Sequence, residues 1–552
     1  MPEFRAILQV HPADDLIVAL CDLKAGGQVS LNGRSWTLRD PIPAKQKFAA
    51  RDFAPGDLLT MYGVTVGRAT RPIPAGSLLH TQNVVHQAAA FTGKQRDITW
   101  QPPDVTRWQN ATFQGYRRSS GPAGTANHWI VIPLVFCENR NLSFMREALN
   151  RALGYTRTSP YERYAQRLAS LHSQPGFDRL AEQVMLEDDD LTAPAPLFPN
   201  ISGVKFLEHG LGCGGTRQDA QALCNLLAGY IAHPNVAGAT ILSLGCQHAQ
   251  VSLLQESLAN LHPAFDKPLH IFEQQKSTSE RDMMARAIRT TFTALAHAND
   301  QTRQPCPISD LIVGVECGGS DGFSGISANP AIGHTADLLA ALGAAPVLSE
   351  FPELCGVEQS LCDRCTTPDL AEKFVKLMRA YEGAAQACGS GFDANPSPGN
   401  IRDGLITDAI KSAGAAKKGG TSPIIDVLDY GEPIRRHGGL TLYCTPGNDV
   451  ESTTALAGGG CTLMLFSTGL GTPTGNPICP TLKIATNTTL ARRMPDLIDL
   501  DTGPIITGET DVETMGAHLL DLCLQTASGH YIPKAVHLAQ DDFLPWKRGV
   551  SL

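Results

Sequence analysis

Hydrophobic residues form short runs in the first 92 residues, and turns that contain glycine separate these runs. Val29–Leu31, Leu58–Met61 and Val64–Val66 are typical runs, with glycines at positions 56, 63, 67 and 76 between or beside them. This pattern predicts short strands joined by tight turns. We therefore expect a small β domain over residues 1–92, followed by a polar linker over residues 93–112.

From residue 113 onward, longer apolar runs alternate with segments of helical pattern. Strand-like runs occupy residues 129–135, 204–207, 239–244, 311–315, 462–466 and 482–485, while residues 336–342 and 453–457 are helix-like. Alternation of this kind predicts an α/β fold with mainly parallel sheets. We divide this part into an α/β domain at 113–262 and a second at 263–552, which together would form a two-part core.

The strand-like run 311–315 leads directly into a polar, glycine-rich segment, Glu316–Pro330. In open α/β sheets, ligands bind in the crevice outside the carboxyl ends of the strands, and glycine allows the backbone to approach a ligand closely. We interpret the segment as part of a functional site. The alternative is a tight structural turn capped by serine and aspartate.

Cysteine and histidine also follow predicted strands. Cys137, His209, Cys213, Cys246 and Cys317 all lie where an apolar run ends. If these strand ends converge, such a thiolate and imidazole set would suit ferrous iron, zinc or an iron–sulfur centre. Each cysteine alone could equally be a small buried hydrophobe. Cys362 and Cys365 form the one CxxC pair, but zinc would need a second pair, so we interpret them as part of a helix surface or core.

Composition narrows the function classes. The chain has 552 residues, of which 42% are hydrophobic and 18% charged, and its net charge of -9 disfavours nucleic acid and anionic membranes as partners. It shows no signal peptide and no run long enough to span a bilayer, so a cytoplasmic protein with reduced thiols is expected. The glycine-rich stretches lack a Walker continuation and Rossmann spacing, so we expect no nucleotide cofactor, and an oxidoreductase is disfavoured.

Several motifs, in a fixed order, carry a family resemblance. They are Glu316–Pro330, Asn395–Asn400, Thr445–Asp449, Phe466–Gly469 and Pro480–Asn487. Together they resemble the altronate/galactarate dehydratase family, bacterial lyases that remove water from sugar acids. The resemblance covers almost the whole chain. It implies that residues 1–92 form an SAF domain, whose closing motif is similar to Ala75–His80.

Dehydration of a 2,3-dihydroxy acid requires a base, an electrophile that holds the enolate, and an acid for the departing hydroxyl. The resemblance implies ferrous iron or another divalent metal as the electrophile, held by the five strand-end residues above. The candidate catalytic residues are His80, Glu316, Asp321 and Lys483, with Lys411 and Lys418 as further ionisable candidates. The candidate substrate-binding residues are Ser320, Ser324, Asn329, Asn400, Asn448 and Asp449. Each ionisable group could instead be a solvated side chain or a structural partner.

The chain departs from the family pattern at several polar positions. Leu470 stands where arginine is usual, and Ile401 where lysine is usual. Further changes are at Gln46, Met61, Gln82, Ala126 and His128. Aliphatic side chains cannot replace a cationic clamp on a carboxylate. Two hypotheses therefore remain. One is a hydro-lyase that converts a different small hydroxy acid to a 2-oxo-3-deoxy acid. The other is a non-catalytic or differently specific relative, such as a metal-binding protein or another carbon–oxygen or carbon–sulfur lyase. A homo-oligomer is expected by analogy only.

Overall fold

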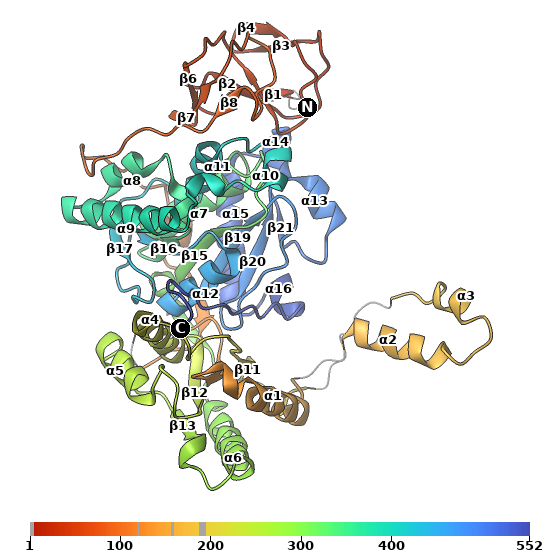
Figure 1. The fold of residues 1–552 in the computed structure, drawn as a ribbon, viewed down its shortest axis with the longest axis vertical. Coiled ribbons are helices and arrows are strands. Elements are labelled where there is room, and N and C mark those ends of the chain that lie inside the picture. Colours follow the sequence, from red (N-terminus) through yellow and green to blue (C-terminus); the bar gives the residue numbers. More distant parts are fainter. Residues whose placement is uncertain (1–4, 120, 156–158, 187–194) are drawn as a thin grey trace.

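Three regions follow one another along the long axis of the molecule (Figure 1). The computed structural model describes residues 5–119, 121–155, 159–186 and 195–552. An N-terminal β domain lies at one end, the C-terminal α/β domain is central, and the middle α/β domain lies at the other end. The expected α/β class with a small β domain at the N-terminus is thus confirmed. In the described residues, no helix is both long and apolar enough to cross a membrane.

The N-terminal β domain consists of three small antiparallel sheets, with strand orders β1-β2-β5, β3-β4 and β6-β7-β8. The strands are β1 (Ile7–Leu8), β2 (Leu16–Ala19), β3 (Gln28–Leu31), β4 (Arg34–Thr37), β5 (Lys47–Ala49), β6 (Leu58–Met61), β7 (Val64–Ala69) and β8 (Val84–Val85). Ile17, Trp36 and Phe48 belong to a small separate core. The domain therefore has its own hydrophobic centre, as its short apolar runs predicted.

The middle domain is built on a four-stranded parallel sheet of order β11-β10-β12-β13. Its strands are β10 (His128–Pro133), β11 (Gly203–Phe206), β12 (Val236–Ser243) and β13 (Leu269–Glu273). Its helices are η2 (Phe136–Glu138), α1 (Asn139–Leu153), α4 (Arg217–Ala232), α5 (Val251–Leu261), η3 (Gln274–Lys276) and α6 (Glu280–Ala298). The short helices α2 (Pro160–Leu171) and α3 (Phe177–Ala181) project away from the body of the molecule (Figure 1).

This sheet extends beyond the domain boundary expected at residues 262 and 263. β13 pairs with β12 in parallel, and α6 packs against both strands. The middle domain therefore continues to the end of α6. A further antiparallel pair, β9 (Thr112–Gly115) with β14 (Gln304–Pro307), joins the segments before and after the domain. The apolar pattern alone did not reveal to which sheet β13 belongs.

The C-terminal domain contains a seven-stranded parallel sheet of order β17-β18-β16-β15-β19-β20-β21. Its strands are β15 (Ile312–Cys317), β16 (Ala345–Leu348), β17 (Ile424–Leu428), β18 (Leu440–Tyr443), β19 (Leu463–Thr468), β20 (Thr481–Ala485) and β21 (Leu500–Asp501). Its α-helices are α7 (Ala328–Ala341), α8 (Glu358–Arg364), α9 (Pro368–Ala387), α10 (Pro398–Arg402), α11 (Asp408–Ala415), α12 (Asp449–Gly459), α13 (Thr488–Arg493), α14 (Gly503–Thr507), α15 (Val512–Ala527) and α16 (Lys534–His537). Short 3-10 helices are η1 (Thr106–Trp108), η4 (Ile308–Asp310), η5 (Phe351–Leu354), η6 (Phe392–Ala394) and η7 (Ala416–Gly419).

The order of this sheet decides which loops can share a site. β15 is central, with β16 on one side and β19 on the other. Because parallel strands end at the same edge of a sheet, the segments after β15, β16 and β19 emerge together. The N-terminal β domain lies next to α10, α11 and α14 at one end of this domain (Figure 1). Residues from the small domain can therefore reach the same edge.

Candidate active site

Glu316, in β15, is the centre of a buried polar cluster. Its carboxyl group is fully buried, and Oε2 accepts hydrogen bonds of 2.7 Å from the hydroxyls of Ser349 and Ser452. Oε1 is buried and has no hydrogen-bond partner among the described residues. Burial, together with the neighbouring Glu350 carboxylate, raises the pKa of Glu316 well above its usual value. A buried acceptor without a partner is costly, so this oxygen is suited to a ligand.

Two more glutamates follow β16 and face two lysines. Lys418 Nζ lies 2.5 Å from an oxygen of Glu350, and Lys411 Nζ lies 2.6 Å from an oxygen of Glu353. Burial opposes the ionisation of Glu353, but Lys411 outweighs it and the pKa of Glu353 is lowered. Glu350 has a φ of 62°, a strained conformation for a residue with a side chain. The surrounding contacts hold this strain at the edge of the sheet.

Cys317 lies between these glutamates. Its amide donates to Oε2 of Glu350 at 3.2 Å, and its Sγ lies 3.4 Å from Oε2 of Glu353. Burial and the nearby Glu350 carboxylate raise the pKa of the Cys317 thiol well above its usual value. Without a bound cation the sulfur is therefore a thiol, not a thiolate.

Asp449, at the start of α12, and Lys483, in β20, complete the cluster. Burial and the neighbouring Glu350 raise the pKa of Asp449 to about 7. Burial lowers the pKa of Lys483 to about 7, and its Nζ lies 3.9 Å from the ring centre of Phe466 and donates to Thr472 O at 2.9 Å. An acid and an amine that both titrate near neutral pH are typical of catalytic sites.

Gly318 allows these groups to approach one another. A Cβ added at Gly318 would lie 2.1 Å from Oδ2 of Asp449 and 2.5 Å from Cζ of Phe466. Both distances are below van der Waals contact, so no larger residue fits here without movement. The glycine-rich segment is therefore required by side-chain packing at the cluster, and not only by the turn.

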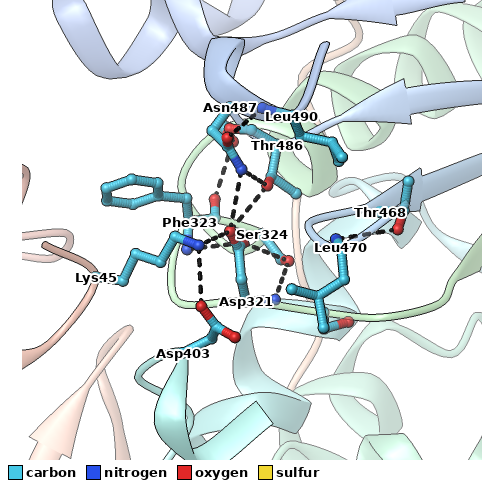
Figure 2. Close-up of polar contacts among 12 residues, drawn as sticks. Lys45, Asp321, Phe323, Ser324, Asp403, Thr468, Leu470, Thr486, Asn487 and Leu490 are labelled. Atoms are coloured by element: carbon cyan, nitrogen blue, oxygen red, sulfur yellow. Dashed lines mark hydrogen bonds and ion pairs between the residues drawn. The ribbon is translucent and has the colours of Figure 1, made fainter. Parts of the chain in front are cut away.

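Asp321 lies in the same loop and is almost completely satisfied (Figure 2). Its Oδ1 accepts hydrogen bonds from the amide of Phe323 and the hydroxyl of Ser324, both at 3.1 Å. Its Oδ2 accepts from Thr486 at 3.1 Å and pairs with Nζ of Lys45 at 3.0 Å. Figure 2 shows Lys45 reaching Asp321 from the N-terminal β domain and then contacting Asp403. Asp321 thus joins the two domains, and its catalytic role stays a prediction from the sequence.

The predicted substrate-binding residues lie around the same loop, but several serve the fold. Asn329 accepts a hydrogen bond from Ser467 and donates to Gly414 O. Asn400 closes the capping box of α10 with Ser397 and donates to Ser320 O at 2.7 Å, and Asn448 caps α12. Ser324 hydrogen bonds to Asp321. Asp449 alone among the six residues lies in the carboxylate cluster.

His80 lies in the N-terminal β domain, and its contacts are local. Its Nε2 lies 3.3 Å from a guanidinium nitrogen of Arg71, and its Nδ1 accepts from the Gln82 amide. Burial and Arg71 lower its pKa. The small domain reaches the candidate site through Lys45 and through Gln46, which donates to Arg402 O at 2.9 Å.

The five predicted metal ligands are divided between two sheets. Cys137, His209, Cys213 and Cys246 follow strands of the middle domain, whereas Cys317 ends β15. Both ring nitrogens of His209 are engaged, because Nε2 donates to Pro133 O at 2.7 Å and Nδ1 accepts from Leu211 N. Burial also lowers its pKa to about 4. Among the described residues, only Cys317 of the five joins a group with metal-binding geometry.

The carboxylate cluster of the C-terminal domain fits a divalent cation better than the five predicted ligands do. One group of ligand atoms comes from Glu316, Glu350 and Asp449, and another from Cys317, Glu350 and Glu353; within each group the atoms lie within 4.8 Å of one another. The four carboxyl groups of this cluster lie near two lysines, Lys411 and Lys418. Oε1 of Glu316 and Oε1 of Glu350 are both buried, and neither has a hydrogen-bond partner in the described part of the chain. Oxygen-rich ligand sets of this kind suit hard or borderline divalent ions.

Sequence reasoning missed Lys45, Glu350 and Glu353. Glu350 and Glu353 follow the strand Ala345–Leu348 in the same way that Glu316 ends its own strand, so the strand-end rule would have found them. Lys45 carries no comparable signal, because its partner Asp321 is distant in sequence and belongs to another domain.

Two of the departures from the family pattern border the Asp321 loop. Leu470 is 38% exposed, and a Cβ on Gly319 would lie 3.2 Å from that of Leu470. Ile401 is half-buried in α10, next to Asn400, which holds Ser320. Leu470 therefore places an aliphatic side chain beside this loop, on the same side of Figure 2 as Asp321 and Thr468.

Comparison with known proteins divides the chain into three consecutive regions. The family model for the SAF domain of altronate/galactarate dehydratase matches residues 5–87. The model for the second domain of D-galactarate dehydratase/altronate hydrolase matches residues 115–299, and the model for the D-galactarate/altronate dehydratase C-terminal domain matches residues 308–551. The chain is also 32% identical to altronate dehydratase of Escherichia coli (strain K12) over 527 residues, 95% of each chain. The chain belongs to the altronate/galactarate dehydratase family.

Further relatives in this family cover the chain almost completely. Altronate dehydratase of Bacillus subtilis (strain 168) is 30% identical over 556 residues, 99% of this chain and all of the relative. Galactarate dehydratase (L-threo-forming) of Escherichia coli (strain K12) is 29% identical over 528 residues, 95% of this chain and 92% of the relative. The family resemblance inferred from the motifs is confirmed. The match to the second-domain model extends beyond residue 262, as the strand β13 and the helix α6 of the middle domain do.

Proposed function

We propose that this protein is a metal-dependent hydro-lyase that removes water from a hydroxy acid related to altronate or galactarate and forms a 2-oxo-3-deoxy acid. Three of its relatives are altronate or galactarate dehydratases by name. The observation that carries the proposal is the buried cluster in which Glu316 and Glu350 could hold a metal beside Asp449 and Lys483, an acid and an amine that each have a pKa of about 7.

Lys483 is our candidate for the base. Near pH 7 about half of its side chains are neutral amines, because burial lowers the pKa to about 7. A neutral amine can accept the proton from the carbon next to the substrate carboxylate. A lysine at its usual pKa would be protonated and could not do so.

Asp449 is our candidate for the acid. Burial and the neighbouring glutamates keep part of its population protonated near pH 7, as its pKa of about 7 requires. A protonated carboxyl group can donate to the 3-hydroxyl as that group leaves as water. The resulting enol then becomes the 2-oxo-3-deoxy acid by proton transfer to carbon 3.

Glu316 and Glu350 are our candidates to hold the metal, through the buried oxygens that lack partners. A divalent ion such as ferrous iron, when bound, would polarise the carboxylate and hydroxyl oxygens of the substrate. A cluster with the single thiol of Cys317 does not provide the cysteines that an iron–sulfur centre requires. The Lys411 ammonium group holds the pKa of Glu353 below its usual value, whereas burial raises the pKa of Glu350 although Lys418 pairs with it; both lysines hold their glutamates in place.

The substrate should differ from the usual sugar diacid or hexonate at one end. Leu470 places an aliphatic side chain beside the Asp321 loop, and Ile401 lies in α10 next to Asn400, which holds Ser320 of that loop. Burial of an unpaired carboxylate against aliphatic surface costs several kcal/mol. We therefore propose a hydroxy acid whose distal end is neutral or apolar.

The test is an anaerobic screen of 2,3-dihydroxy acids with ferrous iron, with detection of 2-oxo acid formation. We expect turnover of at least one acid with a neutral distal end, and stoichiometric iron that Glu350→Gln reduces. Cys213→Ala, in the middle domain, is the matched control and should keep its iron. If the iron-loaded protein forms no 2-oxo acid from any member, or if Cys213→Ala loses iron and Glu350→Gln keeps it, the proposal fails.

A further inference from the structure

A second group with metal-binding geometry lies outside the carboxylate cluster. A ring nitrogen of His86, the Sγ of Cys355 and a carboxylate oxygen of Asp408 lie within 4.8 Å of one another. They come from three separate segments. His86 follows β8 at the end of the N-terminal β domain, Cys355 follows η5, and Asp408 is the first residue of α11. The fold thus brings imidazole, thiol and carboxylate together from two domains.

The carboxylate of Asp408 is buried, and its hydrogen bonds do not fully replace the hydration that it loses. Its side chain is 2% exposed, and Oδ1 accepts a hydrogen bond of 3.1 Å from Ser412. Oδ2 is buried and receives no hydrogen bond from an N–H or O–H group among the described residues. The thiol of Cys355, a weak donor, is the other partner of this carboxylate. A buried carboxylate that one hydroxyl and one thiol satisfy is expensive unless a cation or a proton is added.

His86 retains a free nitrogen for a ligand. Its Nδ1 accepts a long hydrogen bond of 3.4 Å from the Ala409 amide, next to Asp408. Within the described part of the chain, no hydrogen bond engages its Nε2. This contrasts with His209 in the middle domain, where both nitrogens are engaged by the backbone.

The group is accessible through a cleft of about 360 Å³ that His86 and Cys355 line. Glu358 and Glu382 also line this cleft, and no lysine or arginine is among its described lining residues. The surroundings therefore favour a cation. Water in the cleft, or one of these glutamates, can supply a fourth ligand.

We propose that His86, Cys355 and Asp408 form a second metal site, which takes a borderline dication of the zinc type and fastens the end of the N-terminal β domain to α11. Nitrogen, sulfur and oxygen ligands in one group are typical of zinc and cobalt, whereas the main cluster is dominated by oxygen. The thiol proton leaves to solvent when the thiolate binds. The site is independent of the proposed reaction, although α11 also carries Lys411, the partner of Glu353.

The site is tested by titration of chelator-treated, full-length protein with Co²⁺, with the near-ultraviolet charge-transfer absorption of a thiolate–cobalt bond as the signal. We expect saturation with one thiolate-bound equivalent. Cys355→Ser should abolish the absorption, and His86→Gln should weaken binding at least ~10-fold. Cys317→Ser removes the thiol of the main cluster and should keep the absorption. Cys388→Ser removes an exposed thiol and should also keep it.

A second measurement covers the risk that a variant folds poorly. Zn²⁺ should raise the thermal unfolding midpoint of the natural protein and of Cys317→Ser by more than it raises that of folded His86→Gln, in which the carboxylate cluster is the remaining group with metal-binding geometry among the described residues. The half-buried side chain of His86 can be replaced with little disturbance. The proposal is overturned if the natural protein shows no thiolate–cobalt absorption, if Cys355→Ser retains it, or if Cys317→Ser alone removes it.

Discussion

The Nζ of Lys45 lies 3.0 Å from Oδ2 of Asp321, so a side chain of the N-terminal β domain neutralises a fully buried carboxylate of the C-terminal domain. Thr486 and Ser324 hydrogen bond to the same carboxylate. The pair therefore couples the placement of the small domain to the loop that borders the candidate active site.

Removal of this cation should destabilise the protein. We expect Lys45→Met to lower the free energy of unfolding by about 2 kcal/mol, since it leaves Asp321 buried without its ion pair; the 21% exposure of the Lys45 side chain reduces the loss from that of a fully buried pair. Denaturant unfolding measures the change. Arg51→Met, which removes a surface pair with Asp15, is the control and should cost under about 1 kcal/mol. Equal losses in both variants would contradict the prediction.

The kcat/KM of the reaction should fall on both the acid and the alkaline side of neutral pH. The amine of Lys483 must be unprotonated, so its active fraction rises as pH increases through its pKa of about 7. The carboxyl group of Asp449 must be protonated, so its active fraction falls as pH increases through its pKa of about 7. A bell-shaped profile of kcat/KM with its maximum near pH 7 follows.

Single substitutions separate the two limbs of this profile. Asp449→Asn should lower kcat by roughly 10² to 10⁴ and remove the alkaline limb, and Lys483→Met should cause a similar loss and remove the acid limb. Rates of 2-oxo acid formation across pH measure both effects. An unchanged profile in Asp449→Asn would show that another group is the acid.

A methyl group at Gly318 should disrupt the site. Its Cβ would lie 2.1 Å from the Asp449 carboxylate, so we expect Gly318→Ala to reduce turnover strongly and to cost about 1–3 kcal/mol of stability. Gly210→Ala is the control, because a Cβ there meets no atom within 4 Å. Activity assays and thermal unfolding of both variants provide the measurement. Full activity in Gly318→Ala would mean that Asp449 can move without loss of function.

The aliphatic residues should determine the substrate. The natural protein should convert altronate and galactarate poorly, and Leu470→Arg combined with Ile401→Lys should raise kcat/KM for them at least tenfold relative to a neutral hydroxy acid. A charge-assisted hydrogen bond is worth about 1.5–3 kcal/mol, which corresponds to such a factor. Efficient conversion of either sugar acid by the natural protein would disprove the idea, because another cation would then bind the carboxylate.

The sequence alone was sufficient for the fold class, most strands of the core and the family. Apolar runs such as 129–135 and 311–315 became β10 and β15, because a strand buried on both faces must be almost continuously hydrophobic. The sequence also predicted Glu316, Cys317, Asp449 and Lys483 as site residues, since each lies in a recognisable motif next to a strand or helix end. All four take part in one buried cluster.

Only the tertiary structure decided which strand ends are neighbours. Cys137, Cys213 and Cys246 follow strands as Cys317 does, but they belong to another sheet, and the order of β15, β16 and β19 instead brings Glu350 and Glu353 to Cys317. Hydrophobic periodicity records which residues are buried, and it carries no information on which strand pairs with which. The same limit applies to Lys45, because its pairing with Asp321 depends on how two domains dock.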